Sequence, residues 1–404
     1  MVLSACLTPV HAENTAAVGV SPVAGADALP VYIGLDAEFD YPGSTSAEAI
    51  KRGMLIAMEE INQRGGVLGG RPLALLEKSN HSMPARSLVN IEALAANPDV
   101  AAIFCGRFSP TVLDSLPVIH RLQIPMLDPW AAADGIVDNG FQPNYVFRLS
   151  LRDSWAMQAM IALAGAKGKH RLGLLLLNTS WGRSNQFAAE QYVASHPDYR
   201  IAGIHWFNWN EESLRDKYLS LINKGAEAVL FVGNDFDAVN LVKSLETVDA
   251  RQRLPIISHW GVTGGDFTGR AGKLLHDIDF SVVQTYSFIG KKDKAAMRVL
   301  AAAKRLFGVN GARELESPVG VAHAYDLTHI LALAIDQAGV LDRSRIRDAL
   351  ERVTDYAGLI QSYARPFSPE RHEALSAQNA FMAVYAPDNA IEPLPRQRRV
   401  PKAP

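Results

Sequence analysis

Short apolar runs alternate with amphipathic stretches along most of the chain, beginning at Val31. In the first amphipathic stretch, residues 47–64, apolar side chains recur at helical spacing, and two glycines then end the helix. Strands are predicted over residues 31–36, 72–77, 100–105, 124–127 and 145–149. Helices are predicted between them, over 47–64, 85–96 and about 111–122. This alternation is typical of βαβ units and a mostly parallel sheet.

A second series of the same kind begins after a helix capped by Asp153. Its strands are predicted over residues 171–177, 201–207, 228–232, 255–258 and 280–284, with a late strand over 380–385. Its helices are predicted over 184–194, 211–224, 238–245, 295–307, 320–338 and 343–353. The fold class is therefore α/β, with two Rossmann-like lobes of similar size.

Composition narrows the function without identifying it. The chain has 404 residues, of which 48% are apolar and 20% charged, as in ordinary globular proteins. Its 40 basic and 42 acidic residues give a net charge of −2, so it has no general basic field for nucleic acid. Two cysteines, Cys6 and Cys105, exclude a disulfide framework and a multi-cysteine metal site. The apolar run at 172–177, interrupted by Gly173, is far too short to span a bilayer.

The two ends of the chain differ from the body. Residues 1–30 have no periodic pattern and contain two overlapping processing signals. Leu3-Ser4-Ala5-Cys6 is typical of a lipoprotein box, and Val10-His11-Ala12 has the form of a signal-peptidase site. These favour a leader, export to the periplasm and a possible lipid anchor on Cys6, and a disordered cytoplasmic tail is the alternative. Residues 391–404, rich in arginine and proline, are expected to form a solvated basic tail.

The segment 59–73, with the sequence EEINQRGGVLGGRPL, resembles the signature of type I periplasmic binding proteins, most closely the Leu/Ile/Val-binding branch. Other pieces follow in that family's order: Cys105-Gly106 with Ser109, Ile124-Pro125, Val146-Phe147-Arg148, Trp181-Gly182 and Tyr325-Asp326. The resemblance covers about residues 31–387. It implies two lobes joined by three crossings, near residues 149–152, 284–287 and 358–362. Lobe 1 would hold residues 31–150 and 285–357, and lobe 2 residues 151–284 and 358–390.

By the same resemblance, the protein is expected to capture a small solute by lobe closure and deliver it to membrane permease subunits of an ABC transporter. The solute would be an amino acid or a similar compound, and no catalysis, cofactor or metal is implied. A ligand-sensing module of the same fold, signalling to a separate receptor, is the alternative. A hydrolase using Ser109 and His259 is disfavoured, because no triad, P-loop or dinucleotide fingerprint is present.

Ligand residues are expected on the loops that follow strand ends. Ser109 matches the family's carboxylate-binding serine, although an ordinary helix N-cap explains it equally well. Arg107 is a second possible carboxylate partner, though a solvated arginine is the more ordinary reading. The family's threonine after the fourth strand is missing from Trp130-Ala131-Ala132-Ala133, and the acid that holds an α-ammonium is replaced by His259-Trp260. The site for an ordinary amino acid is therefore incomplete.

Aromatic and acidic side chains take the place of the missing groups. Asp235, with Asp36 or Asp128, is expected to hold an amine. Four of the six tryptophans are expected to sandwich a flat or cationic body, although packing alone explains any one of them. The candidate site comprises Ser109, Trp130, Ala131, Ala132, Asp128, Trp155, Trp181, Asp235, Trp260, Asp36 and Tyr41.

Overall fold

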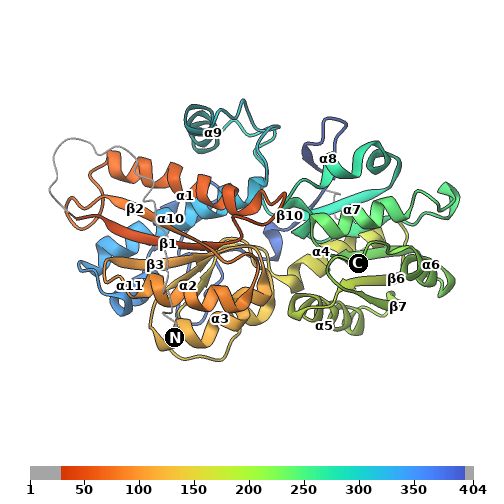
Figure 1. Cartoon of the computed structure of the whole chain (residues 1–404), viewed down its shortest axis with the longest axis horizontal. Helices are drawn as coiled ribbons and strands as arrows, with labels where there is room; N and C mark the ends of the chain where they lie inside the picture. Colours follow the sequence, from red (N-terminus) through yellow and green to blue (C-terminus); the bar gives the residue numbers. More distant parts are fainter. Residues whose placement is uncertain (1–28, 396–404) are drawn as a thin grey trace, which may run out of the picture.

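The computed structural model describes residues 29–395, which form two α/β lobes side by side (Figure 1). The leader signals, with Cys6, and the arginines after residue 395 lie outside the described residues. We call the lobes the first and the second lobe, each defined by its sheet. The α/β prediction with two lobes is confirmed.

The first lobe is built on a five-stranded parallel sheet with the order β2-β1-β3-β4-β5. Its strands are β1 (Val31–Ala37), β2 (Leu73–Ser79), β3 (Val100–Cys105), β4 (Met126–Asp128) and β5 (Val146–Arg148). Its helices are α1 (Ser46–Gln63), α2 (Pro84–Ala95), α3 (Ser109–Arg121), α9 (Lys294–Phe307), α10 (Pro318–Ala338) and α11 (Arg343–Leu350). Figure 1 shows this lobe on the left, with α1 and α10 side by side.

Helix α10 is the buried centre of this lobe. It packs against α1 so closely that a Cβ on Gly53 would lie 2.3 Å from the carbonyl oxygen of Val321. Among the described residues, α10 is the one helix long and apolar enough to cross a membrane, but 94% of that stretch is buried inside the protein. Its apolar character is therefore explained by the core that it fills.

The second lobe repeats the same topology and extends it. Its sheet has the order β14-β13-β10-β9-β8-β6-β7, in which the last five strands are parallel. The strands are β6 (Arg171–Leu177), β7 (Arg200–Phe207), β8 (Ala228–Val232), β9 (Ile256–Ser258), β10 (Phe280–Gln284), β13 (Phe381–Tyr385) and β14 (Ile391–Pro393). The helices are α4 (Asp153–Ala166), α5 (Ser180–Ser195), α6 (Arg215–Asn223), α7 (Asp235–Ser244) and α8 (Phe267–Ala271). Strand β14 lies inside the segment that the sequence suggested as a tail.

The chain passes between the lobes after β5 and after β10. The third crossing differs from the expectation. The short strands β11 (Tyr356–Ala357) and β12 (Ser362–Tyr363) pair with each other, and Tyr356 and Tyr363 both donate hydrogen bonds to Asp326 of α10. Farther along, Glu373 forms a bridge with Arg148 of β5. Residues 358–375 therefore contact the first lobe, and the chain crosses near residues 376–380, just before β13.

Candidate ligand-binding site

The candidate site lies where both sheets reverse their strand order. The first sheet and the parallel part of the second share one pattern, in which the first strand lies between the second and the third. Such reversal points leave a crevice at the carboxyl ends of the strands, where open α/β sheets bind ligands. Loops from both lobes meet here around a small, partly open cavity. Its lining residues are Arg107, Phe108, Ser109, Pro110, Trp130, Ala132, Leu177, Thr179, Trp181, Trp209, Asn234, Trp260 and Gly261.

The lobes are in direct contact beside this cavity. The backbone N–H of Thr45 donates to the carbonyl of Gly264, and that of Asp266 donates to the carbonyl of Gly43. Ser44 and Gly265 form an antiparallel bridge between the lobes. The structure therefore has closed lobes.

Ser109 is the first residue of α3, one position after the extended Phe108. Its hydroxyl oxygen accepts hydrogen bonds from the backbone N–H groups of Ala132 and Ala133, both at 3.2 Å. The sequence offered an N-cap or a carboxylate-binding role, and no side-chain cap bond is present at this helix. Because the oxygen already accepts two hydrogen bonds, its own proton is free to be donated to a ligand oxygen.

Trp130 and Trp260 meet across the two lobes, with ring centroids 5.6 Å apart. Asp128 fixes the loop that carries Trp130, because its Oδ1 accepts from the N–H groups of Trp130 and Ala131 at 2.9 and 2.7 Å. Behind the ring lies Gly320, where a Cβ would come within 2.8 Å of the indole. The two tryptophans thus form one fixed wall of the cavity.

Trp181 is held by Asp153 at the start of α4. Its Nε1 donates to Asp153 Oδ1 at 3.0 Å, and Nε2 of His259 lies 3.0 Å from the same oxygen. The rings of Trp181 and His259 meet edge to face, with centroids 5.0 Å apart. The described contacts of His259 thus go to Asp153, Trp181 and Trp260, and those of Ser109 go to backbone amides, so these contacts do not pair the two residues as a hydrolase would require.

Arg107 is buried between the lobes, contrary to the solvated reading. Its Nη1 lies 2.9 Å from Oδ1 of Asp235 in the second lobe, and its Nε lies 3.8 Å from Oε1 of Glu38. The guanidinium also lies against the rings of Phe108 and Tyr41, at 4.7 and 5.8 Å from their centroids. Its three nitrogens are buried and make no well-aligned hydrogen bond to the described residues. The positive charge of Arg107 is therefore paired with Asp235, while its N–H groups remain available to form well-aligned hydrogen bonds to another group.

Several expected site residues lie outside the cavity lining. The carboxylate of Asp36 accepts hydrogen bonds from Ser87, Asn90 and Asn80, and burial raises its pKa to about 6. Burial likewise raises the pKa of Asp128 to about 7. Asp235 faces Arg107 from behind the lining. The remaining three are Ala131, buried in the first lobe's core, Trp155, half-buried against the core, and Tyr41, which contacts Phe108 edge to face.

Other cavity residues were not expected from the sequence. Phe108, Pro110 and Thr179 each lie within a few residues of a predicted strand end, as the expected site residues do. Trp209 follows β7, the edge strand of the second sheet, and contacts Phe108 with ring centroids 5.4 Å apart.

Within residues 29–395, no group of three or more His, Cys, Asp or Glu side chains is arranged to hold a metal ion.

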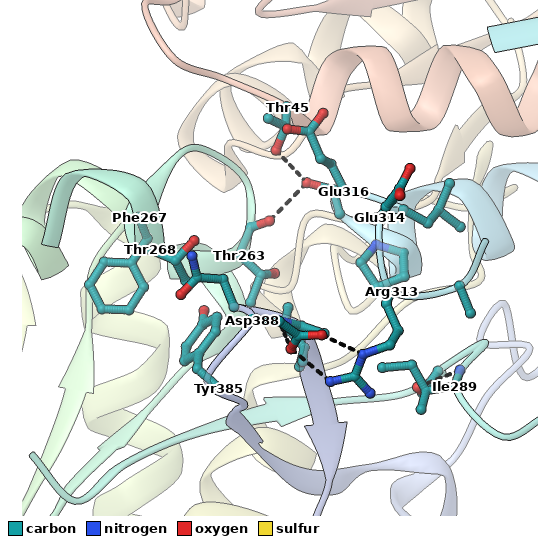
Figure 2. A pocket seen from close by; sticks show the side chains of 18 of the residues that line it. Thr45, Thr263, Phe267, Thr268, Ile289, Arg313, Glu314, Glu316, Tyr385 and Asp388 are labelled. Carbon is teal, nitrogen blue, oxygen red and sulfur yellow. Dashed lines mark hydrogen bonds and ion pairs between the residues drawn. The ribbon is translucent and has the colours of Figure 1, made fainter. Parts of the chain in front are cut away.

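A second cavity, of about 180 Å³, lies between the lobes near the second crossing. Figure 2 shows its side chains, with Arg313 directed at Asp388. Arg313 lies on the loop between α9 and α10, and Asp388 on the turn between β13 and β14. Its Nε and Nη2 contact the two carboxylate oxygens of Asp388 at 2.5 and 2.7 Å, and its Nη1 contacts Glu392 at 2.6 Å. We call this set of ion pairs the Arg313 clasp.

A hydroxyl chain continues the contact between the lobes. The hydroxyls of Thr45 and Ser317 lie 2.6 Å apart, and Ser317 donates to the carbonyl of Thr263 at 2.8 Å (Figure 2). Ser317 directly precedes Pro318 and has a φ of +46°, a conformation that residues other than glycine rarely adopt. The α9–α10 loop thus grips the second lobe at two points.

Comparison with known proteins agrees with this architecture. A family model described as periplasmic binding protein matches residues 30–386. A search of curated protein sequences found no significant match. A type 1 periplasmic binding protein from Bordetella pertussis Tohama I superposes with a TM-score of 0.80 at 21% identity, covering 91% of this chain and 100% of that one.

Two other solved structures were determined with ligands. The branched-chain amino acid transporter substrate binding protein LivJ from Streptococcus pneumoniae, in complex with isoleucine, has a TM-score of 0.73 at 18% identity and covers 90% and 99% of the two chains. A solute binding protein of an ABC transporter from Rhodopseudomonas palustris HaA2, in complex with p-hydroxybenzoic acid, has a TM-score of 0.75 at 14% identity and covers 91% and 98%. At these identities the likeness concerns the fold, which is that of type I periplasmic binding proteins. These relatives bind solutes and are not enzymes, and the family match over most of the chain shows that this protein belongs to the periplasmic binding proteins.

Proposed function

We propose that this protein is an exported solute-binding protein that captures a small aromatic carboxylate between its lobes and delivers it to the membrane subunits of an ABC transporter. The observation that carries this proposal is the cavity lined by four tryptophans, one arginine and no acidic residue. Its location is periplasmic, in keeping with the family, and the weak processing signals before residue 13 support export.

Arg107 and Ser109 supply the donors for a carboxylate. The nitrogens of Arg107 are buried without well-aligned partners, and a guanidinium binds a carboxylate through two parallel hydrogen bonds. Ser109 has a free hydroxyl proton two residues away, at the start of α3. Both residues line the same cavity, so an anionic group is recognised at this end.

The tryptophan wall favours a flat body. Trp130, Trp181 and Trp260 present aromatic surface to the cavity from both lobes. Aromatic rings prefer offset-stacked or edge-to-face contacts with other rings, each worth about 0.5–1.5 kcal/mol beyond the buried area. A planar ligand therefore gains more here than an aliphatic side chain of equal volume.

An amino acid fits less well, because its α-ammonium requires an acidic partner. The acids expected to hold an amine are engaged elsewhere: Asp235 with Arg107, Asp36 with Ser87 and Asn90, and Asp128 with its own loop. A buried ammonium without a carboxylate would carry a large desolvation cost. The Rhodopseudomonas palustris structure bound to p-hydroxybenzoic acid is a precedent for aromatic acids on this fold.

Thermal unfolding of the purified protein against a ligand panel tests this function. The panel contains benzoate, 4-hydroxybenzoate and phenylacetate, the amino acids leucine and phenylalanine, and the amine phenethylamine. A ligand at about a hundred times its Kd stabilises the folded state by roughly 2.7 kcal/mol. We expect the aromatic acids to raise Tm and the amine to leave it unchanged.

Trp130→Ala and Trp260→Ala are expected to lose this stabilisation, whereas Trp155→Ala, outside the lining, retains it. A Tm rise with leucine alone would overturn the aromatic-acid assignment and favour an amino acid. A rise that survives the loss of Trp130 and Trp260 would show that the tryptophan wall does not contact the ligand.

A further inference from the structure

We infer that Trp209 is a specificity-determining residue that donates its indole N–H to a second oxygen acceptor on the solute. The favoured solute is therefore an aromatic acid that carries an oxygen substituent in addition to its carboxylate. This inference rests on the proposed function and narrows its ligand class.

Trp209 reaches the cavity from an unexpected part of the fold. It lies two residues after β7, the strand at the outer edge of the second sheet, and it lines the cavity with residues that follow more central strands. Its ring contacts Phe108 of the first lobe, with centroids 5.4 Å apart and planes inclined at 48°. The ring thus spans the gap between the lobes in the closed structure.

The polar end of this ring is buried without a partner. Nε1 of Trp209 is inaccessible to solvent and makes no hydrogen bond to the described residues. Trp181 differs in this respect, because its Nε1 donates to Asp153. An indole N–H is a donor only, so Trp209 requires an acceptor that the described residues do not supply.

The buried polar atoms of the cavity that lack a hydrogen-bond partner are all donors. Among its lining residues, the buried side-chain polar atoms without a hydrogen bond are the three nitrogens of Arg107 and Nε1 of Trp209, and all four are donors. A carboxylate satisfies Arg107 and leaves Trp209 unpaired. A buried donor left without a partner costs about 1–3 kcal/mol, so a solute with a second acceptor is favoured over one without it.

The preference for a solute with a second acceptor can be measured with two aromatic acids of nearly equal size. A hydroxyl and a methyl group differ little in volume, but only the hydroxyl accepts a hydrogen bond. A site with a buried donor rejects the analogue that lacks the matching group, because the donor then stays unpaired. We therefore expect the protein to prefer 3- or 4-hydroxybenzoate to the corresponding methylbenzoate.

Isothermal titration calorimetry with 3- and 4-hydroxybenzoate and 3- and 4-methylbenzoate tests this inference. In the unsubstituted protein, at least one hydroxybenzoate is expected to bind roughly two- to tenfold more tightly than its methyl counterpart, as one neutral hydrogen bond provides. Trp209→Phe keeps an aromatic ring against Phe108 and removes the donor. It is expected to abolish this preference, because no buried donor is then left unpaired when methylbenzoate binds.

Two further variants separate the possible failures. Trp155→Phe, half-buried and outside the lining, should keep the preference. Arg107→Gln should weaken all four acids together and leave the preference in place. A preference that persists in Trp209→Phe, or an equal loss for all four acids, would overturn the role of Trp209 and leave the proposed function standing. If none of the acids binds the unsubstituted protein, the proposed ligand class fails, and this inference fails with it.

Discussion

Arg107 of the first lobe and Asp235 of the second lobe approach to 2.9 Å between Nη1 and Oδ1, and each side chain is 1% exposed. This ion pair links the two lobes. If the lobes separated, both charges would be exposed to water. Closure therefore buries a guanidinium and a carboxylate together, and each compensates for the desolvation of the other.

Arg107→Gln is expected to weaken the binding of an aromatic carboxylate by roughly 10- to 100-fold. Hydrogen bonds to charged groups contribute about 1.5–3 kcal/mol, and the substitution also leaves Asp235 buried without its counter-charge. Calorimetry on Arg107→Gln, Asp235→Asn and the double variant separates these effects. If Arg107→Gln weakens binding only by leaving Asp235 without its counter-charge in the closed lobes, adding Asp235→Asn to this variant should restore the affinity for the aromatic carboxylate. An affinity unchanged in Arg107→Gln would exclude contact between this residue and the ligand.

Neutralising the Arg313 clasp is expected to open the lobes of the unliganded protein. Arg313 contacts both oxygens of Asp388 and also Glu392, and it lowers the pKa of Asp388 to about 2. Because the clasp is solvent-accessible, salt screens it. Small-angle X-ray scattering should show a larger radius of gyration for Arg313→Gln. The same increase is expected for the unsubstituted protein when salt is raised from about 0.01 M to about 1 M, which shortens the Debye length from about 30 Å to about 3 Å. Arg251→Gln, at an exposed arginine that contacts Asp249 in the same lobe, should leave the radius unchanged.

Glu373→Gln is expected to destabilise the protein by about 3–5 kcal/mol, as the loss of one partner of a buried ion pair does. Arg148 is fully buried and contacts both oxygens of Glu373, at 3.0 and 2.5 Å. Its Nη1 also donates to the carbonyl of Ala133, which ties this pair to the loop that carries Trp130. Urea unfolding provides the measurement. Asp279→Asn, which removes an exposed partner of Lys167, should cost less than about 1 kcal/mol; equal losses in the two variants would contradict this expectation.

The pH dependence of stability should reveal the buried Asp128. Burial raises its pKa to about 7 from an ordinary value near 3.8. Between about pH 4 and pH 7 the unfolded chain releases this proton and the folded protein retains it, so the free energy of unfolding falls as pH rises. Asp128→Asn preserves the Oδ1 acceptor for Trp130 and has no proton to lose. The unsubstituted protein should therefore lose stability relative to this variant from pH 4.5 to 7.5.

Urea unfolding at four pH values in this range measures that difference. Asp216→Asn, at a 97% exposed side chain, controls for the effect of pH on the whole protein. A difference between Asp128→Asn and the unsubstituted protein that stays constant with pH would show that Asp128 ionises in the folded state as it does in the unfolded chain.

The alternation of strands and helices made most of the fold predictable, because each element carries its own local pattern. The position of Trp181 and Trp260 near strand ends followed from the same pattern. Contacts between residues far apart in the sequence did not follow from this pattern, and the wrong expectations all involve such contacts. Arg107 looked solvated because its partner Asp235 lies 128 positions later in the chain, and the third crossing was misplaced because Glu373 pairs with the distant Arg148.

The sequence also does not show which of the acidic residues at strand ends reach the cleft. Asp36 follows the pattern of a cleft residue, yet Ser87 and Asn90 of α2 bind its carboxylate. Nothing in the local sequence around Asp36 shows which helix will cover it. Trp209 was overlooked for the opposite reason, because the loop of an edge strand is not where a central crevice is expected.

The contact between Trp130 and Trp260 gives the molecule an optical property. The two indoles belong to different lobes, and in this closed structure their centroids lie 5.6 Å apart. Both rings are buried here, and separation of the lobes would be expected to expose them to water. The wavelength and intensity of the intrinsic tryptophan fluorescence are therefore expected to change when the lobes separate, without any attached dye.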